Sequence, residues 1–482
     1  MRALEERAFS LGVSPLILME EAARGAFSLL ERKLGGVSGK RLLFLIGPGN
    51  NGGDGLAMAR LAHQGGAKAR ALLTQEPRSP EAVVNLNHAR AIGVPVSSWQ
   101  QEETLAERPD AVVDAVFGTG FHGGLPDRVL ALAEILNARE LPVLAVDTPS
   151  GLDGADGRAE NLAIRATWTA ALGHLKTGLC LGEGPDWAGE RLLVPLGIPE
   201  AAYRMFEERG EKPLSALEAA DLPGRLPKRP ATLHKGRAGR VLLYAGSPGM
   251  AGAAAMAALA ALKAGAGLVY IACAKELIPV LQTLAPNAIC LELDSAIASP
   301  PDYDAFAAGC GLGTSDAAWR GLSLLYRADV PSVLDADALN LLARQPLAIG
   351  KQTVLTPHPG EAARLLNQSA GEVLQDPLAC AAAIHARYGG TAVLKGPCTL
   401  IDDGSRAALN ITGSPALAKG GSGDALTGIM AALLAASPET PAFETARTAC
   451  LWLGLAGEEA QRRFGSRGAL TGEVIDCLKK FA

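Results

Sequence analysis

Short apolar runs that alternate with helical stretches constrain the fold of this 482-residue chain more than any other feature of the sequence. In the first half these runs are bounded by Gly, Pro or Asp, as is typical of strands buried on both faces. The predicted strands are Arg41–Ile46, Ala67–Leu73, Asp110–Phe117 and Pro142–Val146. The segments between them predict helices at Gly55–His63, Pro80–Ala91 and Asp127–Ala138. This alternation predicts an α/β fold with a parallel, doubly wound sheet.

The alternation stops over residues 195–235, where prolines and charges accumulate, and we place a domain junction near Gly210. A second alternation follows the junction. Its predicted strands are Arg240–Ala245, Leu268–Cys273, Ser332–Leu334, Thr353–Thr356 and Thr391–Lys395, and its predicted helices are Gly252–Ala266, Ser422–Ala436 and Phe443–Phe464. The sequence therefore predicts two α/β domains, 1–210 and 211–482. Their motifs differ, so they are not an internal repeat.

Composition narrows the class of protein. Apolar residues make up 48% of the chain, enough for two buried cores, and the net charge of −5 argues against a nucleic-acid binder. We expect no membrane segment, because no apolar stretch reaches about 18 residues. The eight cysteines form no CxxC pair and lie mostly in apolar runs, as is typical of buried thiols in a reducing compartment. The N-terminus has no signal-peptide pattern, so we expect a cytoplasmic protein.

The strongest motif of the first half is the run GPGNNGGDG at Gly47–Gly55, between a predicted strand and a predicted helix. Its glycines would let the backbone turn tightly and approach a ligand. The helix N-terminus suits a phosphate, and Asn50, Asn51 and Asp54 add polar groups. The alternative is an ordinary β–α turn, since Asn, Asp and Gly are common turn residues.

Two more polar loops follow predicted strands, one from Asp114 to Gly120 and on to Gly124, the other from Asp147 to Asp153. Ligands of open α/β sheets bind beyond the carboxyl ends of the strands. The three loops therefore predict a single pocket.

The three loops and the following Leu175–Leu179 resemble the NAD(P)HX epimerase family over residues 1 to about 200. The resemblance implies a Rossmann-like α/β/α sandwich that binds hydrated NADH or NADPH (NADHX, NADPHX). It also implies a potassium ion on Asn51, Asp114 and Ser150, oxygen donors that suit a hard cation. The chain departs from the family at two positions: His122 stands in the glycine loop, and Glu5 stands where the family usually has Asp. The implied cofactor contacts are Asn50, Asn51, Gly52, Gly53, Asp54, Gly118, Thr119, Gly120, Phe121, His122, Gly123, Gly124 and Asp147.

The hydrated ring carries a hydroxyl on the carbon next to the ring nitrogen. Epimerisation breaks and remakes that C–O bond, or opens and recloses the ring, and either route needs a group that moves a proton at the hydroxyl. We predict Asp147 for this role, with Lys176 as its electrostatic partner. The alternative for Lys176 is a solvated surface lysine.

The strongest motif of the second half is AKGGSGDALTG at Ala418–Gly428, at the start of a predicted helix. A glycine-rich turn there presents backbone N–H groups that stabilise a phosphoryl group in transfer. Asp424 is then predicted to accept the proton of an attacking hydroxyl. The alternative is that Ser422 or Asp424 only caps the helix.

This turn resembles that of the ribokinase-like superfamily. The motifs KGRAG, GSPGMAGA, DADALN, TPHPGE and LKG, in this order, are similar to the ADP- or ATP-dependent NAD(P)HX dehydratases over residues 214–482. The resemblance implies cofactor contacts at Ala253, Gly313, His358 and Asp424. The implied nucleotide contacts are Lys395, Gly396, Pro397, Cys398, Thr399 and Gly423.

The chain departs from the dehydratase family at three positions: Cys310 replaces a proline, Ser414 replaces Asn, and Lys419 stands where a small residue is common. Lys419 could contact a phosphate or alter the preference between ADP and ATP. For His358, a structural role in the turn is the alternative to a substrate contact.

The expected dehydration follows from leaving-group chemistry, because phosphate leaves the ring carbon far more readily than hydroxide. Phosphoryl transfer to the hydroxyl, with Asp424 as base and the Gly420–Gly423 amides stabilising charge, would precede expulsion of phosphate by the ring nitrogen and loss of a proton. Mg²⁺ would accompany ADP. Two alternatives remain: a small-molecule kinase in the second half, and a non-catalytic binding module in the first. Exposed Ala-rich helices also predict a homo-oligomer.

Overall fold

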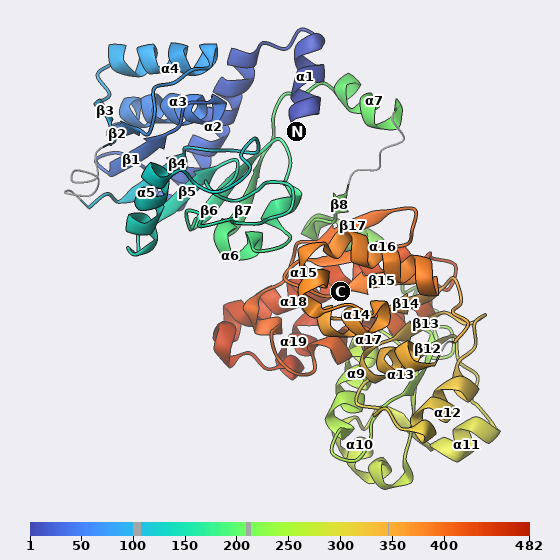
Figure 1. Cartoon of the computed structure of the whole chain (residues 1–482). Helices are drawn as coiled ribbons and strands as arrows, with labels where there is room; N and C mark the ends of the chain where they lie inside the picture. The colour runs from blue at the N-terminus through green and yellow to red at the C-terminus, as the bar shows by residue number, and fades with distance from the viewer. Residues whose placement is uncertain (100–107, 209–213, 346) are drawn as a thin grey trace. The chain divides into compact units, whose positions relative to one another are not determined.

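The computed structural model describes residues 1–99, 108–208, 214–345 and 347–482, and the chain divides into two compact units, Met1–Glu211 and Lys212–Ala482 (Figure 1). The predicted junction at Gly210 lies outside the described residues. Each unit is an α/β sandwich with its own sheet, which confirms the predicted fold class.

The N-terminal unit holds a seven-stranded sheet of order β3-β2-β1-β4-β5-β6-β7, in which every neighbouring pair is parallel. Strands β1 and β4 are neighbours although two strands intervene in sequence, so the strand order reverses between them. The strands are β1 (Arg41–Ile46), β2 (Lys68–Leu73), β3 (Val96–Ser98), β4 (Ala111–Ala115), β5 (Val143–Val146), β6 (Trp168–Leu172) and β7 (Glu190–Val194).

Two cores cover the two faces of this sheet, because alternate residues of a strand point to opposite sides. On β1, Phe44 and Ile46 join α2–α4 in one core, whereas Leu43 and Leu45 join α5 in the other. Figure 1 shows α2, α3 and α4 on one side of the strands and α5 on the other. The helices are α1 (Arg2–Ser10), α2 (Pro15–Leu34), α3 (Asn50–Gln64), α4 (Pro80–Ala91), α5 (Asp127–Asn137), α6 (Gly184–Ala188) and α7 (Glu200–Glu208).

The C-terminal unit holds a ten-stranded sheet of order β11-β10-β9-β12-β13-β14-β15-β16-β17-β8. Strand β16 pairs antiparallel with both β15 and β17, and the other pairs are parallel. The strands are β8 (Ser215–Ala216), β9 (Arg240–Tyr244), β10 (Leu268–Cys273), β11 (Ile289–Glu292), β12 (Ala305–Ala308), β13 (Ser332–Leu334), β14 (Thr353–Leu355), β15 (Thr391–Leu394), β16 (Thr399–Asp402) and β17 (Ala407–Asn410).

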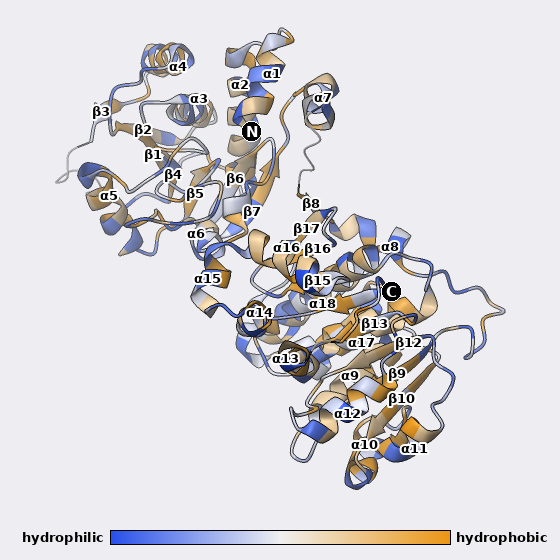
Figure 2. Cartoon of the chain, turned by 45° about the vertical axis from the view of Figure 1, so that its right-hand side comes forward, coloured by the Kyte–Doolittle hydropathy of each residue, from blue (hydrophilic) through white to orange (hydrophobic). Residues whose placement is uncertain are grey.

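Helices α9, α17, α18 and α19 build the main core of this unit together with the sheet. Figure 2 shows the hydrophobic colour concentrated on the strands and on these inner helices. The helices are α8 (Leu222–Arg225), α9 (Ala251–Lys263), α10 (Ile278–Leu284), α11 (Leu293–Ala298), α12 (Asp316–Leu325), α13 (Ala336–Arg344), α14 (Pro359–Leu366), α15 (Ala370–Gln375), α16 (Pro377–Tyr388), α17 (Ser422–Ala436), α18 (Ala442–Gly468) and α19 (Thr471–Cys477).

Two expectations are wrong. Helix α3 begins at Asn50 rather than at Gly55, so most of the GNNGGDG run is helical. The Ala-rich helices are not exposed: Ala254–Ala261 of α9 and Ala425–Ala435 of α17 supply mostly buried residues to the core of their own unit. Small side chains let these two helices approach each other closely. Because the helices are buried, they give no reason to expect a homo-oligomer.

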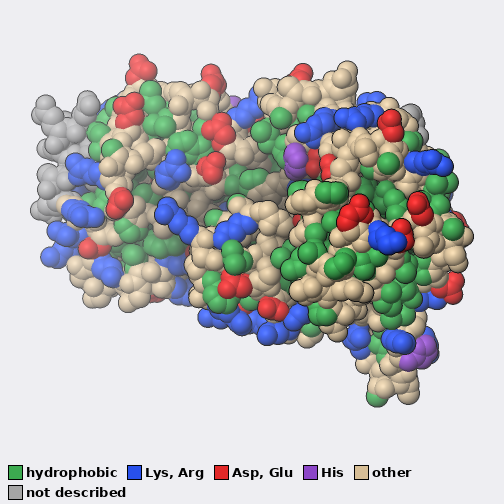
Figure 3. Space-filling view, turned by 90° about the horizontal axis from the view of Figure 1, so that it is seen from below, with side chains coloured by type: hydrophobic (Ala, Val, Ile, Leu, Met, Phe, Trp, Pro, Cys, Tyr) green, Lys and Arg blue, Asp and Glu red, His purple; other side chains and the backbone are tan. Residues whose placement is uncertain are grey.

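The surface charge, the cysteines and the helix lengths bear on the remaining expectations from composition. Basic and acidic side chains are interspersed over the face shown in Figure 3. All eight cysteines are thiols outside any disulfide, and all but Cys290 are buried. Within the described ranges, no helix has both the length and the apolar character needed to span a membrane.

Candidate active sites

A cavity of about 520 Å³ opens in the N-terminal unit where β1, β4 and β5 end. It lies at the reversal of strand order between β1 and β4, the usual ligand position in an open parallel sheet. The predicted residues that line it are Asn50, Asn51, Asp54, Gly118, Thr119, Gly120, Phe121, His122 and Asp147. The structure therefore brings all three polar loops to one pocket.

The sequence argument missed the contribution of α1, because Met1, Arg2 and Glu5 also line the cavity. Glu5 departs from the family pattern, but nothing in the local sequence indicates that an N-terminal helix returns to the ends of β1 and β4. Gly123 and Gly124 belong to the same loop as His122, whose imidazole Nδ1 lies 2.6 Å from the Asp153 carboxylate.

The glycines of the first motif serve packing more than turning. A Cβ on Gly52 would lie 2.0 Å from the Gly47 carbonyl oxygen, and one on Gly53 would lie 2.7 Å from the Met19 side chain. A Cβ on Gly55 would meet Ala115 at 2.4 Å. None of these glycines has a positive φ. The motif thus lets α3 lie against β1, β4 and α2, and it places Asn50, Asn51 and Asp54 at the pocket.

Asp147 is the most constrained carboxylate of this pocket. Its backbone adopts φ +70°, a left-handed conformation that costs about 1 kcal/mol for a residue with a side chain. The Lys176 ammonium forms an ion pair with Oδ1, while Oδ2 accepts hydrogen bonds from the Thr119 amide at 2.9 Å and hydroxyl at 2.5 Å. Lys176 is only 6% exposed and donates to the Leu172 carbonyl oxygen at 2.6 Å. The interpretation of Lys176 as a solvated surface lysine is therefore wrong.

Two more carboxyl groups share the pocket with this ion pair. Burial, with the charges of Asp147 and Glu5 adding to it, raises the pKa of Asp54 well above its usual value. Burial and the nearby Asp147 also raise the pKa of Glu5. Three acids face one buried lysine, so the pocket favours protons on Asp54 and Glu5.

Asp114 and Ser150 meet beside the same loops. The Ser150 hydroxyl donates to Asp114 Oδ1 at 2.6 Å and its amide donates to Oδ2 at 2.8 Å. Burial raises the pKa of Asp114 to about 6, although these hydrogen bonds oppose the shift. The buried Nδ2 atom of Asn51 finds no hydrogen-bond partner in the described part of the chain. The carboxylate and hydroxyl oxygens of Asp114 and Ser150 fit a hard cation, whereas the Nδ2 group of Asn51 is a hydrogen-bond donor that requires an acceptor.

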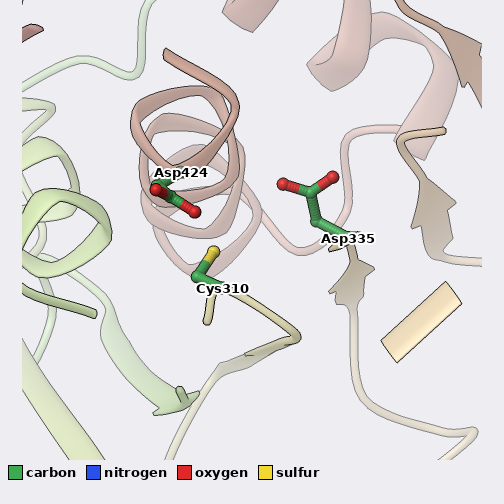
Figure 4. Close-up of side chains that lie close together, drawn as sticks. All are labelled: Cys310, Asp335 and Asp424. Atoms are coloured by element: carbon green, nitrogen blue, oxygen red, sulfur yellow. The ribbon is translucent and has the colours of Figure 1, made fainter. Parts of the chain in front are cut away.

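In the C-terminal unit, side chains from three strand ends and one helix start converge. Figure 4 shows three of them, Cys310, Asp335 and Asp424. Cys310 follows β12, Asp335 follows β13, Lys395 follows β15, and Asp424 lies in the first turn of α17. Asp335 is 1% exposed and accepts from Lys395 Nζ at 2.7 Å and from the Thr427 hydroxyl at 2.9 Å. Burial raises the pKa of Asp424 to about 6, and the nearby Asp335 charge adds to the shift.

Lys395 is held at the centre of this cluster. Burial by itself lowers the pKa of its ammonium, but Asp335 and Glu361 outweigh that effect and the pKa is raised. A Cβ on Gly423 would lie 3.3 Å from Lys395 Nζ, so the glycine keeps the start of α17 open towards the cation. Gly396, Pro397, Cys398 and Thr399 continue from Lys395 into β16, and Cys398 is 4% exposed.

The glycine-rich turn before α17 differs from the one before α3. Gly421 has φ +96°, which only glycine adopts readily, and a Cβ on Gly420 would meet no atom within 4 Å. The first amides of a helix have no partner within the helix. The turn is thus both sharp and open, as an anion cradle requires. Asp424 does not cap α17, since its N-cap is Gly421 and it has no side-chain cap bond.

His358 has a structural role at the start of α14, and its side chain is half-exposed. It is the N-cap of α14, where its Nδ1 atom accepts from the Gly360 amide at 3.0 Å. Its Nε2 atom lies 3.2 Å from Glu361, whose other carboxylate oxygen is 3.9 Å from Lys395 Nζ. The half-exposed imidazole is therefore linked to the Lys395–Asp335 pair through Glu361.

The other predicted cofactor contacts lie at the ends of β9 and β12, where the strand order of this sheet also reverses. Ala253 lies in the first turn of α9, and a Cβ on Gly311 would lie 3.0 Å from its methyl group. Gly313 has φ +79°, and its amide donates to Asp337 at 2.8 Å. Lys419, for which the sequence leaves a phosphate contact open, donates to the carbonyl oxygens of Arg467 (2.6 Å) and Ala469 at the end of α18.

Comparisons with known proteins agree with this division of the chain. Residues 15–178 match the family described as YjeF-related protein N-terminus, and residues 241–480 match the family described as NAD(P)H-hydrate dehydratase. The bifunctional NAD(P)H-hydrate repair enzyme of Moorella thermoacetica is 36% identical over 97% of this chain and 92% of its own length. The chain belongs to the family of bifunctional NAD(P)H-hydrate repair enzymes.

Other members and a solved structure extend the comparison. The bifunctional NAD(P)H-hydrate repair enzyme of Escherichia coli is 36% identical over 99% of this chain and 92% of its own length. The ADP/ATP-dependent NAD(P)H-hydrate dehydratase of Bacillus subtilis, co-crystallised with ATP and Mg²⁺, covers 56% of this chain with a TM-score of 0.51 and 31% identity. That alignment takes in 97% of the Bacillus chain, so the whole of that protein has a counterpart within this longer chain.

Proposed function

We propose that the chain repairs hydrated NADH and NADPH: the N-terminal unit interconverts the R and S epimers of NADHX and NADPHX, and the C-terminal unit dehydrates the S epimer at the expense of ADP. The observation that carries the proposal is the convergence of Asp424, Lys395 and the open Gly420–Gly423 turn at one end of the second sheet. Family membership over nearly the whole chain supports it.

In the epimerase pocket, Asp147 moves the proton at the ring hydroxyl. Its ion pair with Lys176 keeps a charged carboxylate in a buried position, and Thr119 fixes the orientation of Oδ2. The strained backbone at Asp147 is typical of residues held for function. The predicted contacts that line the cavity, Asn50, Asn51, Asp54 and Gly118–His122, bind the cofactor around this group. Gly52, Gly53, Gly123 and Gly124 are not among the lining residues.

A potassium ion on Asn51, Asp114 and Ser150 would supply positive charge beside the pocket. The buried Asp114 carboxylate and the Ser150 hydroxyl oxygen beside it support this site. These residues belong to the α3 start, the end of β4 and the loop after β5, so an ion that holds them would also fix the pocket loops.

In the dehydratase unit, Asp424 accepts the proton of the cofactor hydroxyl as its oxygen attacks the terminal phosphoryl group of the nucleotide. The amides of the Gly420–Gly423 turn and Lys395 stabilise the charge on the phosphoryl oxygens. The ring nitrogen then expels phosphate, and loss of a proton restores the dihydronicotinamide. Ala253, Gly313 and His358 bind the hydrated cofactor, and Lys395–Thr399 with Gly423 bind the nucleotide.

Mg²⁺ would enter with the nucleotide and neutralise phosphate charge. The Bacillus subtilis relative co-crystallised with ATP and Mg²⁺ supports this cofactor. We assign no protein ligand to it. The same relative is named as ADP/ATP-dependent, so either nucleotide is a candidate phosphoryl donor here.

The test of the proposed function is recovery of the dihydronicotinamide absorbance from mixed epimers, with ADP and with ATP in separate reactions. A dehydratase restores the absorbance and releases free phosphate. A small-molecule kinase would instead accumulate a stable phosphorylated product. If the N-terminal unit were only a binding module, conversion would stop once the S epimer was consumed.

Two broader predictions accompany this function. The eight free cysteines support a cytoplasmic location, since thiols persist in reducing compartments. A homo-oligomer stays a prediction without support from the Ala-rich helices. Light scattering coupled to size-exclusion chromatography tests it directly.

A further inference from the structure

The thiol of Cys310 lies between the two carboxylates of the dehydratase cluster. Its side chain is 1% exposed, and its Sγ atom and one oxygen each of Asp335 and Asp424 all lie within 4.8 Å of one another. Figure 4 shows the sulfur directed towards the space between the two acids. Nothing in the mechanism above uses this group.

The main chain fixes the position of this thiol. Gly309 has φ +119°, and a Cβ on it would lie 1.8 Å from the Asp335 carbonyl oxygen. The Cys310 carbonyl oxygen accepts from the Gly246 amide at 2.9 Å, which ties the loop to the end of β9. Gly311, at φ +59°, lies against Met250 and Ala253 on its other side. The backbone of Cys310 is therefore held in place from both sides.

The partners of the two acids differ. Both Asp335 oxygens are engaged, one by Lys395 and the other by Thr427. One oxygen of the Asp424 carboxylate lies within 4.8 Å of the Cys310 Sγ atom. Burial raises the pKa of Asp424 and the Cys310 thiol opposes that rise, while the other charged groups around Asp424 are Asp335, Lys395 and Asp337. Burial, together with the charges of Asp424 and Asp335, raises the pKa of the Cys310 thiol well above its usual value. The group thus remains S–H at neutral pH and can only donate to a carboxylate.

We propose that Cys310 is a positioning residue for the dehydratase reaction: its S–H group donates to the Asp424 carboxylate, orients it and favours the ionised form that accepts the substrate proton. This inference rests on the proposed function of the C-terminal unit. The dehydratase family that this sequence resembles tends to have proline at this position. Proline has no side-chain donor.

The experiment compares the pH dependence of dehydratase kcat in the full-length Cys310→Ala and Cys310→Ser variants, with the S epimer and ADP as substrates. Removing the donor raises the pKa of Asp424, so the acid limb of Cys310→Ala should move up by about half a pH unit. Turnover should then fall about two- to three-fold at pH 5.5 and stay nearly unchanged at pH 8. Cys310→Ser keeps a donor, so its acid limb should lie at or below that of the wild type.

Cys273→Ala is the matched control, since this thiol is also 1% exposed, lies in β10 of the same sheet, and should leave the limb in place. An unmoved limb in Cys310→Ala, or an upward shift in Cys310→Ser, overturns the inference. An Asp424→Asn variant measured alongside separates a failure of the role of Cys310 from a failure of the proposed function. If it is inactive while Cys310→Ala matches the wild type, only the role of Cys310 falls; if it turns over at full rate, the proposed base itself is wrong.

Discussion

Both units place a carboxylate at the carboxyl ends of their strands, but the electrostatic surroundings of the two carboxylates differ. Asp147 is ion-paired with a buried lysine, whereas Lys395 in the second unit pairs with Asp335 and leaves Asp424 to a thiol. The glycine-rich turns of the two units also differ. Before α3 the glycines are buried packing residues, and before α17 they form an open turn with a left-handed Gly421. The first turn thus serves packing, and the second leaves the space that the proposed phosphate site needs.

The largest expected effect comes from exchanging each carboxylate for its amide. Asp424→Asn should lower dehydration of the S epimer by about 10³-fold, and Asp147→Asn should lower epimerisation by about 10²-fold, because a general base is lost in each case. Neither should affect the other reaction. Assays with the pure S epimer and with the pure R epimer separate the two. Loss of both activities from one substitution would show that the units do not act independently.

The ion pair of the first unit gives the next largest effect. Lys176→Met should destabilise the N-terminal unit by about 3 kcal/mol, because it leaves the Asp147 carboxylate buried without its cation. Urea unfolding measures this change. Adding Asp147→Asn to Lys176→Met should recover much of the stability, since the unpaired charge is then gone. A single Lys176→Met variant as stable as the wild type would mean that the pair contributes nothing to the fold.

The pH dependence of dehydration follows from the raised pKa of Asp424. Its pKa of about 6 means that the base is ionised above pH 7 and that kcat should fall about ten-fold per pH unit well below pH 6. The raised pKa also makes the stability of the fold depend on pH. The protonated form of Asp424 stabilises the fold, and this contribution is fully present below about pH 4 and is lost as the pH rises through about 6. Asp424→Asn should therefore raise the melting temperature at pH 8 and leave it unchanged at pH 4. Equal effects at both pH values would contradict the shift.

Potassium should have the smallest effect. At ten times its dissociation constant, the ion stabilises the folded N-terminal unit by about 1.4 kcal/mol, a rise in melting temperature of about 3 °C. Calorimetry in KCl against tetramethylammonium chloride of equal ionic strength measures it. Asn51→Ala should abolish the difference while leaving the hydrogen bonds between Asp114 and Ser150 intact. A potassium effect that survives in this variant would exclude Asn51 as a ligand.

Local pattern was enough for several strands and helices. Strands β1, β10 and β13 and helices α4 and α17 have the bounds that the sequence predicts. The antiparallel pair β16 and β17 was not predicted, because these four-residue strands carry no signal for direction and depend on β15 for pairing. The start of α3 was misplaced, since glycine and asparagine argue against a helix locally while packing against Ala115 and Met19 requires them there.

The sequence alone determined that two α/β units exist and that polar, glycine-rich loops follow their strands, because hydrophobic periodicity and turn residues act over short distances. The tertiary structure decided which groups meet. It buried Lys176 against Asp147, brought α1 and Glu5 to the first pocket, and placed Cys310 beside Asp424. These contacts join residues far apart in the chain, and only the order of the strands in each sheet brings them together.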